Sequence, residues 1–375
     1  MKVLHINCNY TNSALHRAMF RKLEPYGEHR VFIPTDGSIP FTPQEHEFEA
    51  VCFRRYDRYI YFKKQAQIIR TAEQTYNIAD FDCIHAYTLF TDGNAAMELG
   101  KKHGVPYVVA VRNTDINGFF KRRWLLRGRG IKVLENASAV FFLSEEYRRI
   151  LLEKYIPRSK WEMIKSKSYI IPNGIDPFWL ENPAQPKTED ELQRISNGHL
   201  KILVVGRINR YKTPTRTGAA VDELVRRGYD VHFTAVGRVE EPQILDRLYQ
   251  GKNFTYLEPR PKEELLELYR QSDIYVMPST DETFGLVYPE AMSQGLPVIY
   301  SRGEGFYGQV PEGSAGYAVD PHSTEEVAEA ILRVVREYRQ LSARCPELAK
   351  RFDWDRIVEQ YREIYRAFEK KAPLS

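Results

Sequence analysis

Short runs of apolar residues recur along the first 145 residues and alternate with longer stretches of helical character. The helical stretch from Ala14 to Leu23, for example, ends near the turn residues Pro25 and Gly27. Strands that alternate with helices in this way predict a parallel sheet of the α/β class. The runs that predict strands are residues 3–6, 30–33, 82–87, 106–111 and 139–144.

A second series of the same kind begins at Leu200. Between the two series, residues 177–198 are rich in Pro, Asn, Glu and Gln and show no apolar period, which predicts a linker. The sequence therefore predicts two doubly wound α/β domains, whose ligands are expected at the carboxyl ends of the strands. Strands are predicted at 200–205, 231–236, 254–257, 274–277 and 298–301, and helices at 241–250, 261–271, 287–294, 324–340 and 354–370.

Composition fits this picture and excludes several other classes of protein. A chain of 375 residues, 43% hydrophobic and 28% charged, is expected to form two ordinary globular domains. The four cysteines lie far apart and form no Cys-x-x-Cys motif, which indicates reduced thiols rather than a disulfide framework. No apolar run has the length of a membrane span, and His5, Asn7 and Asn9 interrupt the stretch that could have formed a signal peptide. We therefore expect a cytoplasmic protein.

Residues 280–292 carry the most specific candidate chemistry. They follow the predicted strand 274–277 and contain Gly285 in a loop before a short helix. Two carboxylates, Glu282 and Glu290, stand eight positions apart. A carboxylate can accept hydrogen bonds from both hydroxyls of a diol, and the N–H groups at a helix N-terminus favour a phosphate. The stretch thus predicts a site for a phosphorylated sugar, whereas either Glu alone would be more typical of a solvated position.

Two cations follow the first strand of the same predicted domain. Arg207 and Lys212 come directly after the strand at 200–205. A guanidinium binds a phosphate with two parallel hydrogen bonds and an ammonium acts as a point charge, so the pair suits two linked phosphates. Two such cations are usually solvated when they stand alone. Together with the carboxylates of residues 280–292, they favour a functional role.

Charge is unevenly distributed along the chain. Residues 1–170 contain 27 Lys and Arg against 18 Asp and Glu, a net charge of +9. Two stretches, 51–70 and 119–129, combine aromatic residues with Lys and Arg, as expected of a segment that docks on anionic lipid. A solvated helix face with buried aromatic residues explains them equally well. Single-stranded nucleic acid binding shares the composition, but no recognition module accompanies it, so no nucleic-acid partner is expected.

Taken together, these motifs resemble those of the retaining glycosyltransferases of family 4. The resemblance implies the GT-B architecture, in which two Rossmann-like domains face each other across a cleft. It rests on Glu-x7-Glu with Glu-Thr-Phe-Gly-Leu and Glu-Ala-Met at 282–292, Gly-Arg-x4-Lys at 206–212, Pro-Asn-Gly-Ile-Asp at 172–176 and Phe-Asp-Trp at 352–354. The implied parts are an acceptor domain at 1–175, a linker at 176–198, a donor domain at 199–353 and a closing helix at 354–375 that crosses back to the first domain.

The resemblance also implies an activity. It is the metal-independent, retaining transfer of a sugar from a nucleotide sugar, most often UDP-linked, to a glycan or a lipid-linked acceptor, with no cofactor. The basic first half adds an anionic membrane surface as an expected partner, which would place the protein at the inner face of the membrane. No metal site is expected, since the nine histidines show no metal-ligand spacing. The implied donor-binding residues are Gly206, Arg207, Lys212, Glu282, Thr283, Phe284, Gly285, Leu286, Val287 and Glu290, and the implied catalytic residues are Glu282 and Arg112.

Three positions depart from the family pattern. Arg112 stands where members usually carry a histidine, although Asp115 matches the aspartate that follows. A guanidinium stays protonated, so Arg112 cannot act as a base; it would hold a charge, or pack at the strand end and pair with Asp115. The loop at residues 7–13 lacks the usual glycine pair, and residues 303–308 lack the usual Gly-Gly turn.

Two other functions remain open from the sequence alone, because a fold does not determine a function. One is a nucleotide-sugar epimerase or a sugar phosphorylase on the same architecture. The other is a protein that binds a sugar nucleotide without catalysis, which the arginine at position 112 favours slightly. Incubation with labelled UDP-sugars distinguishes transfer, epimerisation and binding without turnover.

Overall fold

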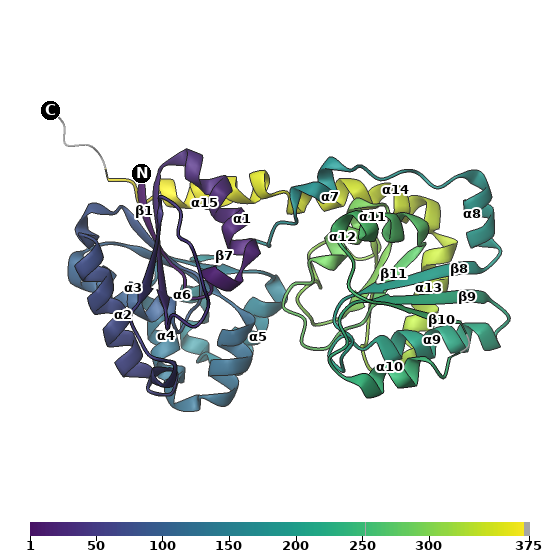
Figure 1. The fold of residues 1–375 in the computed structure, drawn as a ribbon, viewed down its shortest axis with the longest axis horizontal. Helices are drawn as coiled ribbons and strands as arrows, with labels where there is room; N and C mark the ends of the chain where they lie inside the picture. Colours follow the sequence, from purple (N-terminus) through teal and green to yellow (C-terminus); the bar gives the residue numbers. More distant parts are fainter. Residues whose placement is uncertain (252, 371–375) are drawn as a thin grey trace. The chain divides into compact units, whose positions relative to one another are not determined.

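The computed structural model describes residues 1–251 and 253–370, and the chain divides into two compact units (Figure 1). The first unit comprises Met1–Pro172 together with the chain from Trp354 onward, and the second comprises Asn173–Asp353. Each unit is a parallel sheet with helices on both faces, so the predicted α/β class with two doubly wound domains is confirmed. The last five residues of the expected closing segment, 371–375, lie outside the described residues.

The sheet of the first unit has seven parallel strands in the order β3-β2-β1-β4-β5-β6-β7. Its strands are β1 (Lys2–Ile6), β2 (Glu28–Thr35), β3 (Glu47–Val51), β4 (Cys83–Ala86), β5 (Tyr107–Val111), β6 (Ala139–Phe142) and β7 (Ser168–Ile170). Its helices are α1 (Ala14–Leu23), α2 (Tyr61–Thr75), α3 (Asp92–His103), α4 (Arg127–Asn136), α5 (Glu145–Tyr155), α6 (Trp161–Lys165) and α15 (Trp354–Arg366), with short turns η3 (Arg55–Tyr59), η5 (Thr114–Phe120) and η6 (Trp124–Leu126).

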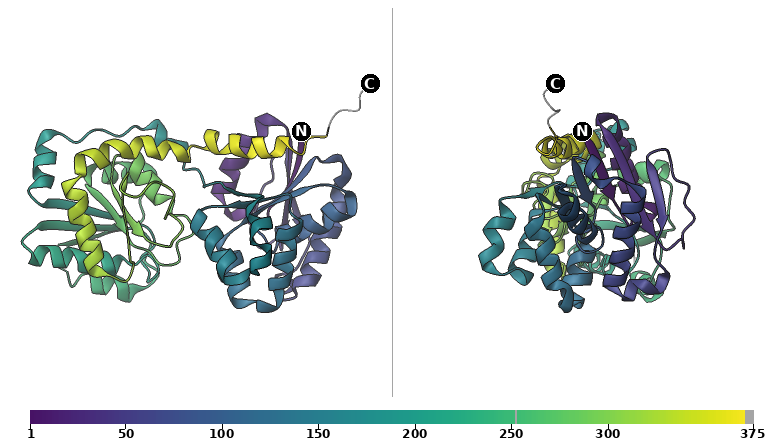
Figure 2. Two further views of the ribbon diagram at one scale, coloured as in Figure 1. Left: turned by 180° about the vertical axis from the view of Figure 1, so that it is seen from behind. Right: turned by 90° about the vertical axis from the view of Figure 1, so that its left-hand side faces the viewer.

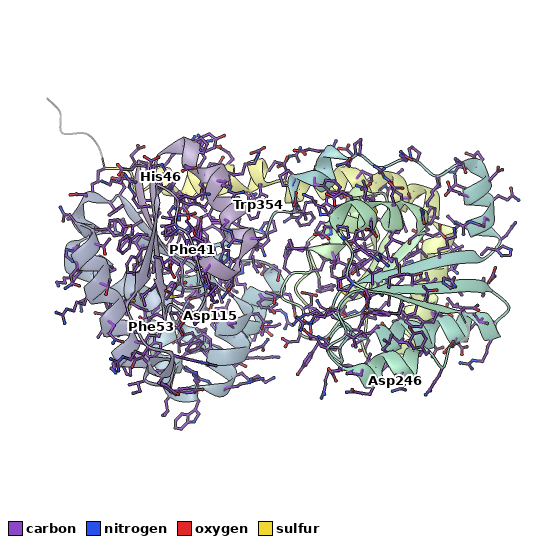
Figure 3. The ribbon with its side chains drawn as sticks, in the orientation of Figure 1. Phe41, His46, Phe53, Asp115, Asp246 and Trp354 are labelled. Atoms are coloured by element: carbon purple, nitrogen blue, oxygen red, sulfur yellow. The ribbon has the colours of Figure 1, made fainter. Side chains whose placement is uncertain are left out.

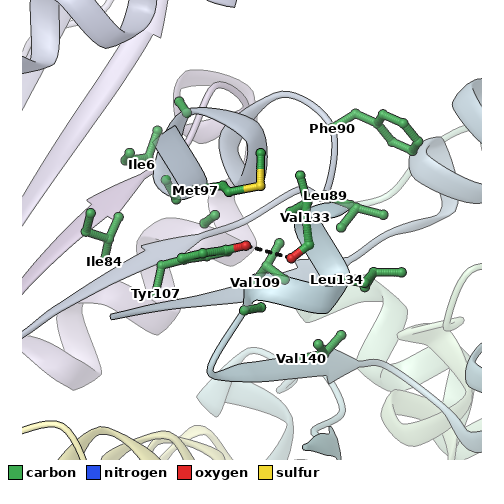
Figure 4. Packing of buried hydrophobic residues seen from close by; sticks show 14 of the residues in the cluster. Ile6, Ile84, Leu89, Phe90, Met97, Tyr107, Val109, Val133, Leu134 and Val140 are labelled. Atoms are coloured by element: carbon green, nitrogen blue, oxygen red, sulfur yellow. Dashed lines mark hydrogen bonds between the residues drawn. The ribbon is translucent and has the colours of Figure 1, made fainter. Parts of the chain in front are cut away.

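This sheet separates two cores, because alternate residues of a strand point to opposite faces. Leu4 and Ile6 of β1 belong to the core that α2, α3, α4 and α5 cover, whereas Val3 faces α1 and α15. Figure 4 shows the first of these cores around Tyr107, whose hydroxyl donates to the carbonyl of Val133 at 2.6 Å. On the other face α15 runs beside α1 (Figures 1 and 2). Its buried residues recur at helical spacing: Trp354, Ile357, Val358, Tyr361 and Tyr365.

The sheet of the second unit has six parallel strands in the order β10-β9-β8-β11-β12-β13. Its strands are β8 (His199–Val205), β9 (Asp230–Val236), β10 (Phe254–Leu257), β11 (Ile274–Met277), β12 (Val298–Ser301) and β13 (Gly316–Val319), the last of which was not predicted. Its helices are α7 (Pro177–Glu181), α8 (Glu189–Ser196), α9 (Pro214–Arg226), α10 (Pro242–Leu248), α11 (Lys262–Gln271), α12 (Val287–Ser293), α13 (Thr324–Arg336) and α14 (Tyr338–Ala349).

Residues 176–198, which were predicted to be a linker, instead lie within the second unit and include two helices, α7 and α8. Each helix buries one apolar residue, Trp179 and Ile195 respectively, which is too few for a periodic pattern. The local signal lies in the caps instead. The Asp176 carboxylate accepts the N–H of Phe178 at 2.9 Å, and Thr188 forms a capping box in α8.

Among the described residues, no helix is both long and apolar enough to cross a membrane.

Candidate active site

The predicted donor residues follow two neighbouring strands at the centre of the second sheet. From β8 the chain adds β9 and β10 on one side of the sheet, and β11, β12 and β13 on the other side, so the strand order changes direction between β8 and β11. Ligands of open α/β sheets bind outside the carboxyl ends of the strands at such a switch point. Residues 206–212 follow β8 and residues 280–292 follow β11. The two segments are joined directly, since the N–H of Thr280 donates to the carbonyl of Tyr211 at 2.7 Å. The fold therefore brings the two predicted motifs together.

Lys212 and Glu282 form an ion pair at this junction. The ammonium of Lys212 donates to Oε2 of Glu282, and the two side chains are only 17% and 9% exposed. Asn209 fixes the segment that carries the lysine, because its Oδ1 accepts the N–H groups of Tyr211 and Lys212 at 3.1 and 3.0 Å. The two residues that the resemblance assigns to phosphate and sugar thus contact each other.

Arg207 pairs with a different carboxylate, that of Glu240, and is 63% exposed. Its Nη1 donates to Oε1 of Glu240 at 3.3 Å, while the amide of Asn209 donates to the other oxygen of Glu240 at 2.7 Å. The hydrogen bond from Asn209, and then the charge of Arg207, hold the pKa of Glu240 below its usual value. An exposed arginine with one long hydrogen bond is free to turn toward a ligand at little cost, since exposed ion pairs contribute about 0–1 kcal/mol.

Gly285 determines the shape of the loop between β11 and α12. Its φ is +79°, and a Cβ at this position would lie 2.4 Å from the ring of Tyr288. That ring cannot move aside, because Tyr288 is buried and its hydroxyl donates to the carbonyl of Met277 at 2.5 Å. Asp281 also has a positive φ of 67°. Backbone strain of this kind costs about 1–3 kcal/mol and often occurs at functional sites.

The other predicted residues of this loop anchor it or begin α12. Phe284 is buried, with its ring 5.7 Å from that of Phe352. The first helical hydrogen bond runs from the N–H of Glu290 to the carbonyl of Leu286 at 3.1 Å. The N–H groups of Leu286 and Val287 precede that bond and have no acceptor within the helix.

Glu290 occupies a half-buried position in the first turn of α12. Burial is the main cause that raises the pKa of its carboxyl to about 7, and the charge of Asp176 adds to the shift. The side chains of Tyr269 and Trp179 lie beside the carboxyl and oppose part of that shift. Trp179 belongs to α7, so the segment expected to be a linker contributes to the surroundings of a predicted donor residue.

Sequence reasoning missed the contribution of Glu304. Its carboxylate accepts the N–H of Glu282 at 2.7 Å, and the N–H of Gly305 donates to the carbonyl of Glu282 at 2.9 Å. Burial raises the pKa of Glu304 to about 7, with a smaller contribution from the charges of Asp281 and Glu282. Residues 303–308, whose role the sequence left undefined, therefore hold the backbone of Glu282 in place. One acidic residue between two glycines after a strand was the available signal.

The first unit contains a cavity of about 290 Å³. It opens at the carboxyl ends of β1, β2, β4 and β5, around the point where strand order reverses between β1 and β4. Half of its lining residues carry a hydroxyl or an amide side chain, and Lys64 is the cation among them. The loop at residues 7–13 contributes Cys8, Asn9, Thr11 and Asn12, so it faces the cavity although it lacks glycines. Asp115 and Phe53, labelled in Figure 3, also line it.

Asp115 is a buried carboxyl that organises the loops around this cavity. It accepts the backbone N–H groups of Leu89, Phe90 and Arg112 at 3.0, 3.2 and 2.8 Å. Burial nevertheless raises the pKa of Asp115 to about 6, because desolvation outweighs these bonds. The bond from Arg112 to Asp115 is thus donated by the backbone N–H of Arg112. The Nε of the Arg112 side chain donates to the carbonyl of Tyr87 at 3.3 Å.

The side chain of Arg112 lies on the face of the sheet that α1 and α15 cover. Its charge contributes to lowering the pKa values of the buried His16 and His85, after burial itself, and His16 falls to about 3. On α15, burial raises the pKa of Tyr361, and the charge of Arg112 opposes part of that rise. Arg112 is not one of the described residues that line the cavity, and its catalytic role stays a prediction.

In the part of the chain that the structure describes, no group of three or more His, Cys, Asp or Glu side chains is arranged to hold a metal ion.

The comparisons with known proteins agree with this architecture. Residues 187–352 match the family model described as glycosyl transferases group 1, and residues 27–166 match that of the glycosyl transferase 4-like domain. The D-inositol 3-phosphate glycosyltransferase of Corynebacterium jeikeium is 32% identical over 308 residues, which cover 76% of this chain and 72% of that protein. For the protein of the same name from Corynebacterium urealyticum, the match spans only 42% of its length.

Two solved structures share the fold over nearly the whole chain. Sucrose-phosphate synthase from Thermosynechococcus elongatus gives a TM-score of 0.74 at 19% identity, covering 98% of both chains. HepE of Anabaena in complex with UDP gives a TM-score of 0.71 at 17% identity, covering 98% of this chain and 100% of that one. These likenesses and the two parallel-sheet α/β units identify the fold as GT-B. The chain belongs to family 4 of the glycosyltransferases.

Proposed function

We propose that the protein transfers a hexosyl group from a UDP-sugar to a hydroxyl of a glycan or lipid-linked acceptor, with retention of anomeric configuration and without a cofactor or metal. The observation that carries the proposal is the Lys212–Glu282 ion pair at the switch point of the second sheet. The proteins that this chain resembles support the donor class, since HepE was solved with UDP and with UDP-glucose. The acceptor would occupy the cavity of the first unit.

In this proposal donor binding separates the ion pair. The diphosphate takes Lys212 as its cation, and Arg207 turns from Glu240 to add a second positive charge. Glu282 is then released to accept hydrogen bonds from hydroxyls of the transferred sugar. Cations held near a leaving group stabilise the charge that develops there, an effect that typically amounts to a factor of about 100–1000 in rate. Glu304 keeps the backbone of Glu282 fixed throughout.

The bond changes follow from retention. The bond between the anomeric carbon and the phosphate oxygen breaks, and a bond from that carbon to the acceptor oxygen forms on the same face. The acceptor proton passes to the departing phosphate oxygen, so UDP leaves carrying it. No basic side chain is required, which agrees with an arginine at position 112.

The proposal is tested by incubating the protein with a panel of labelled UDP-sugars and hydroxyl acceptors. Formation of UDP together with a labelled glycoside is expected, and nuclear magnetic resonance of the product gives its anomeric configuration. An epimerised nucleotide sugar, or tight binding with no product from any acceptor, would contradict the proposal. Chelating agents should leave the rate unchanged.

Donor affinity is expected to rise about tenfold between roughly pH 6 and pH 8, because Glu290 would hold the ribose diol as a carboxylate. Its pKa of about 7 lies above the ordinary value of 4.5 for a glutamate, so the folded protein favours the protonated form. The Glu290 carboxyl therefore stabilises the folded protein fully below about pH 4.5, and this contribution is lost as the pH rises through 7. The affinity for the UDP-sugar should change in the opposite direction and increase over the same pH range. Calorimetry with an intact UDP-sugar measures the effect, since its diphosphate does not titrate in this range.

Glu290→Gln is the matched variant, because it keeps the shape of the side chain and removes the titration. The profile of this variant should flatten and lie near the low-pH affinity of the wild type. Glu304 also has a pKa of about 7. If the donor affinity of Glu290→Gln still changes with pH, adding Glu304→Gln shows whether Glu304 is the cause. A wild-type affinity that does not change with pH would remove Glu290 from the donor site.

A further inference from the structure

Two segments of the first unit, residues 54–63 and 119–127, pack side by side. The rings of Tyr61 and Phe119 lie 6.3 Å apart. Both contact Phe90, since the Tyr61 hydroxyl donates to its carbonyl at 2.7 Å and the Phe119 ring stacks on its ring at 4.5 Å. We refer to the solvent-facing side of these two segments as the aromatic–basic surface.

The most exposed large apolar side chains of the described chain gather on this surface. A folded protein normally keeps such side chains scattered, and a contiguous exposed group marks an interaction site. The four highest exposed fractions belong to Tyr59 (82%), Tyr56 (79%), Leu125 (76%) and Trp124 (67%), and Phe62 (63%) and Ile60 (56%) lie between and beside them in sequence.

A folded turn presents these side chains. Asp57, within η3, has a side chain that is only 4% exposed and pairs with Lys63 at 2.7 Å. Its carboxylate also accepts the N–H of Arg54 at 2.9 Å. These bonds fix the turn from which Tyr56 and Tyr59 project, so the exposure of the two rings is a property of the folded unit.

The charge of the surface is strongly positive. Residues 51–64 contain five basic residues and one acidic residue, and residues 119–129 contain five basic residues and no acidic residue. Arg55, Lys121 and Arg122 are exposed, and no ion pair involves them among the described residues. A cationic surface around exposed apolar side chains is complementary to a bilayer that contains anionic lipid.

The surface adjoins the mouth of the cavity in the first unit. Phe119 belongs to the second segment and lines that cavity of about 290 Å³, and so do Phe53 and Lys64, the residues directly before and after the first segment. Phe53 also packs under Lys64, whose ammonium lies 4.3 Å from the ring centroid. A partner that covers the exposed side chains would therefore lie at the entrance to the cavity.

We propose that the aromatic–basic surface docks on a bilayer containing anionic lipid and thereby presents the cavity to an acceptor held in that bilayer. Aliphatic side chains such as Leu125 and Ile60 favour the acyl boundary of a membrane over nucleic-acid bases, which would stack on rings. Docking requires no sugar donor, whereas the lipid-borne acceptor rests on the function proposed above. A failure of docking is therefore distinguishable from a failure of transferase activity.

The test uses the full chain and two kinds of vesicle, neutral phosphatidylcholine and the same lipid mixed with phosphatidylglycerol. Sedimentation should show binding to the anionic vesicles only, weakened by added salt. Trp124 reports the contact directly, because it is 67% exposed, whereas Trp161 is half-buried and Trp179 and Trp354 are 3% exposed. Its fluorescence should shift to the blue and be quenched by brominated lipid, and Trp124→Phe should bind while losing that signal.

Lys121→Glu combined with Arg122→Glu should weaken binding by at least about 25-fold, since each cation at an anionic surface contributes roughly a factor of five. Leu125→Ser removes an apolar side chain and no charge, so it should weaken binding to the anionic vesicles even at low salt. Arg247→Glu with Tyr249→Ser, an exposed pair on the second unit, is the control and should bind as the wild type does. Thermal melting verifies that each variant is folded. Equal binding to neutral vesicles, binding to neither, or binding to single-stranded nucleic acid in place of vesicles would overturn the proposal.

Discussion

Lys212→Met is expected to lower kcat/KM by about 100- to 1000-fold, the usual cost of removing one preorganised group that stabilises developing charge. Methionine keeps the unbranched stem and removes the ammonium that pairs with Glu282. Most of the loss should appear in kcat, because charge on the leaving diphosphate grows as the bond breaks. Steady-state kinetics with the best UDP-sugar measures it, and wild-type values would remove Lys212 from the site.

A double-mutant cycle with Glu282→Gln separates catalysis from stability. Glu282→Gln alone should cost about 10- to 100-fold in kcat/KM, the value of a charge-assisted hydrogen bond. If the two residues act on phosphate and sugar respectively, their kinetic effects should multiply. Their effects on unfolding should not add, because either single change leaves a mostly buried charge without its partner, at a cost of roughly 3 kcal/mol, and the double change leaves none.

The strands and the principal site motifs could be predicted because their signals are local. A buried parallel strand is recognised in the sequence as a short apolar run, and residues 274–277 and 200–205 are two such runs. Polar residues follow each run directly, so they are expected at the carboxyl end of a strand, where α/β sheets bind ligands. The resemblance then implies the roles of Glu282 and Arg207, which stay predictions. What the sequence did not contain was the contact between Lys212 and Glu282, which depends on β8 and β11 being neighbours.

The missed features share a different cause, since each depends on residues distant in sequence. Glu304 acts through the backbone of Glu282, and nothing near Glu304 indicates that loop. The buried histidines of the first unit are similar. His5 bonds to His29 at 2.9 Å and to the Tyr87 hydroxyl at 3.1 Å, and burial lowers the pKa of both rings. In sequence these histidines look like ordinary polar positions.

Segment 176–198 shows the limit of periodicity as a signal. An amphipathic helix is recognised when several apolar residues recur at helical spacing. In α7 and α8 one residue each is buried, so the caps at Asp176 and Thr188 were the better guide. The consequence extends to the site, because Trp179 of α7 lies beside Glu290.

Gly305→Ala is expected to reduce kcat by roughly 100-fold while the protein remains folded. A Cβ on this residue would lie 2.0 Å from the carbonyl oxygen of Thr283 and 2.7 Å from the nitrogen of Phe284. Both obstacles are backbone atoms, so the loop that carries Glu282 must shift. A displacement of about 1 Å of a positioned group costs on the order of 100-fold in rate, and the effect should appear in kcat with a smaller change in the affinity for free UDP.

Gly308→Ala is the matched control in the same loop. Its φ of +80° makes alanine strained there, but no atom lies within 4 Å of the added Cβ. It should therefore lower the melting temperature through strain, by an amount near the 1–2 kcal/mol per residue typical of left-handed backbone, and leave kcat close to the wild-type value. If the two variants lose activity equally, the loss reflects strain in residues 303–308. If only Gly305→Ala loses kcat, the close approach of Gly305 to Thr283 positions the catalytic loop, and Glu304→Gln should then reproduce part of the defect.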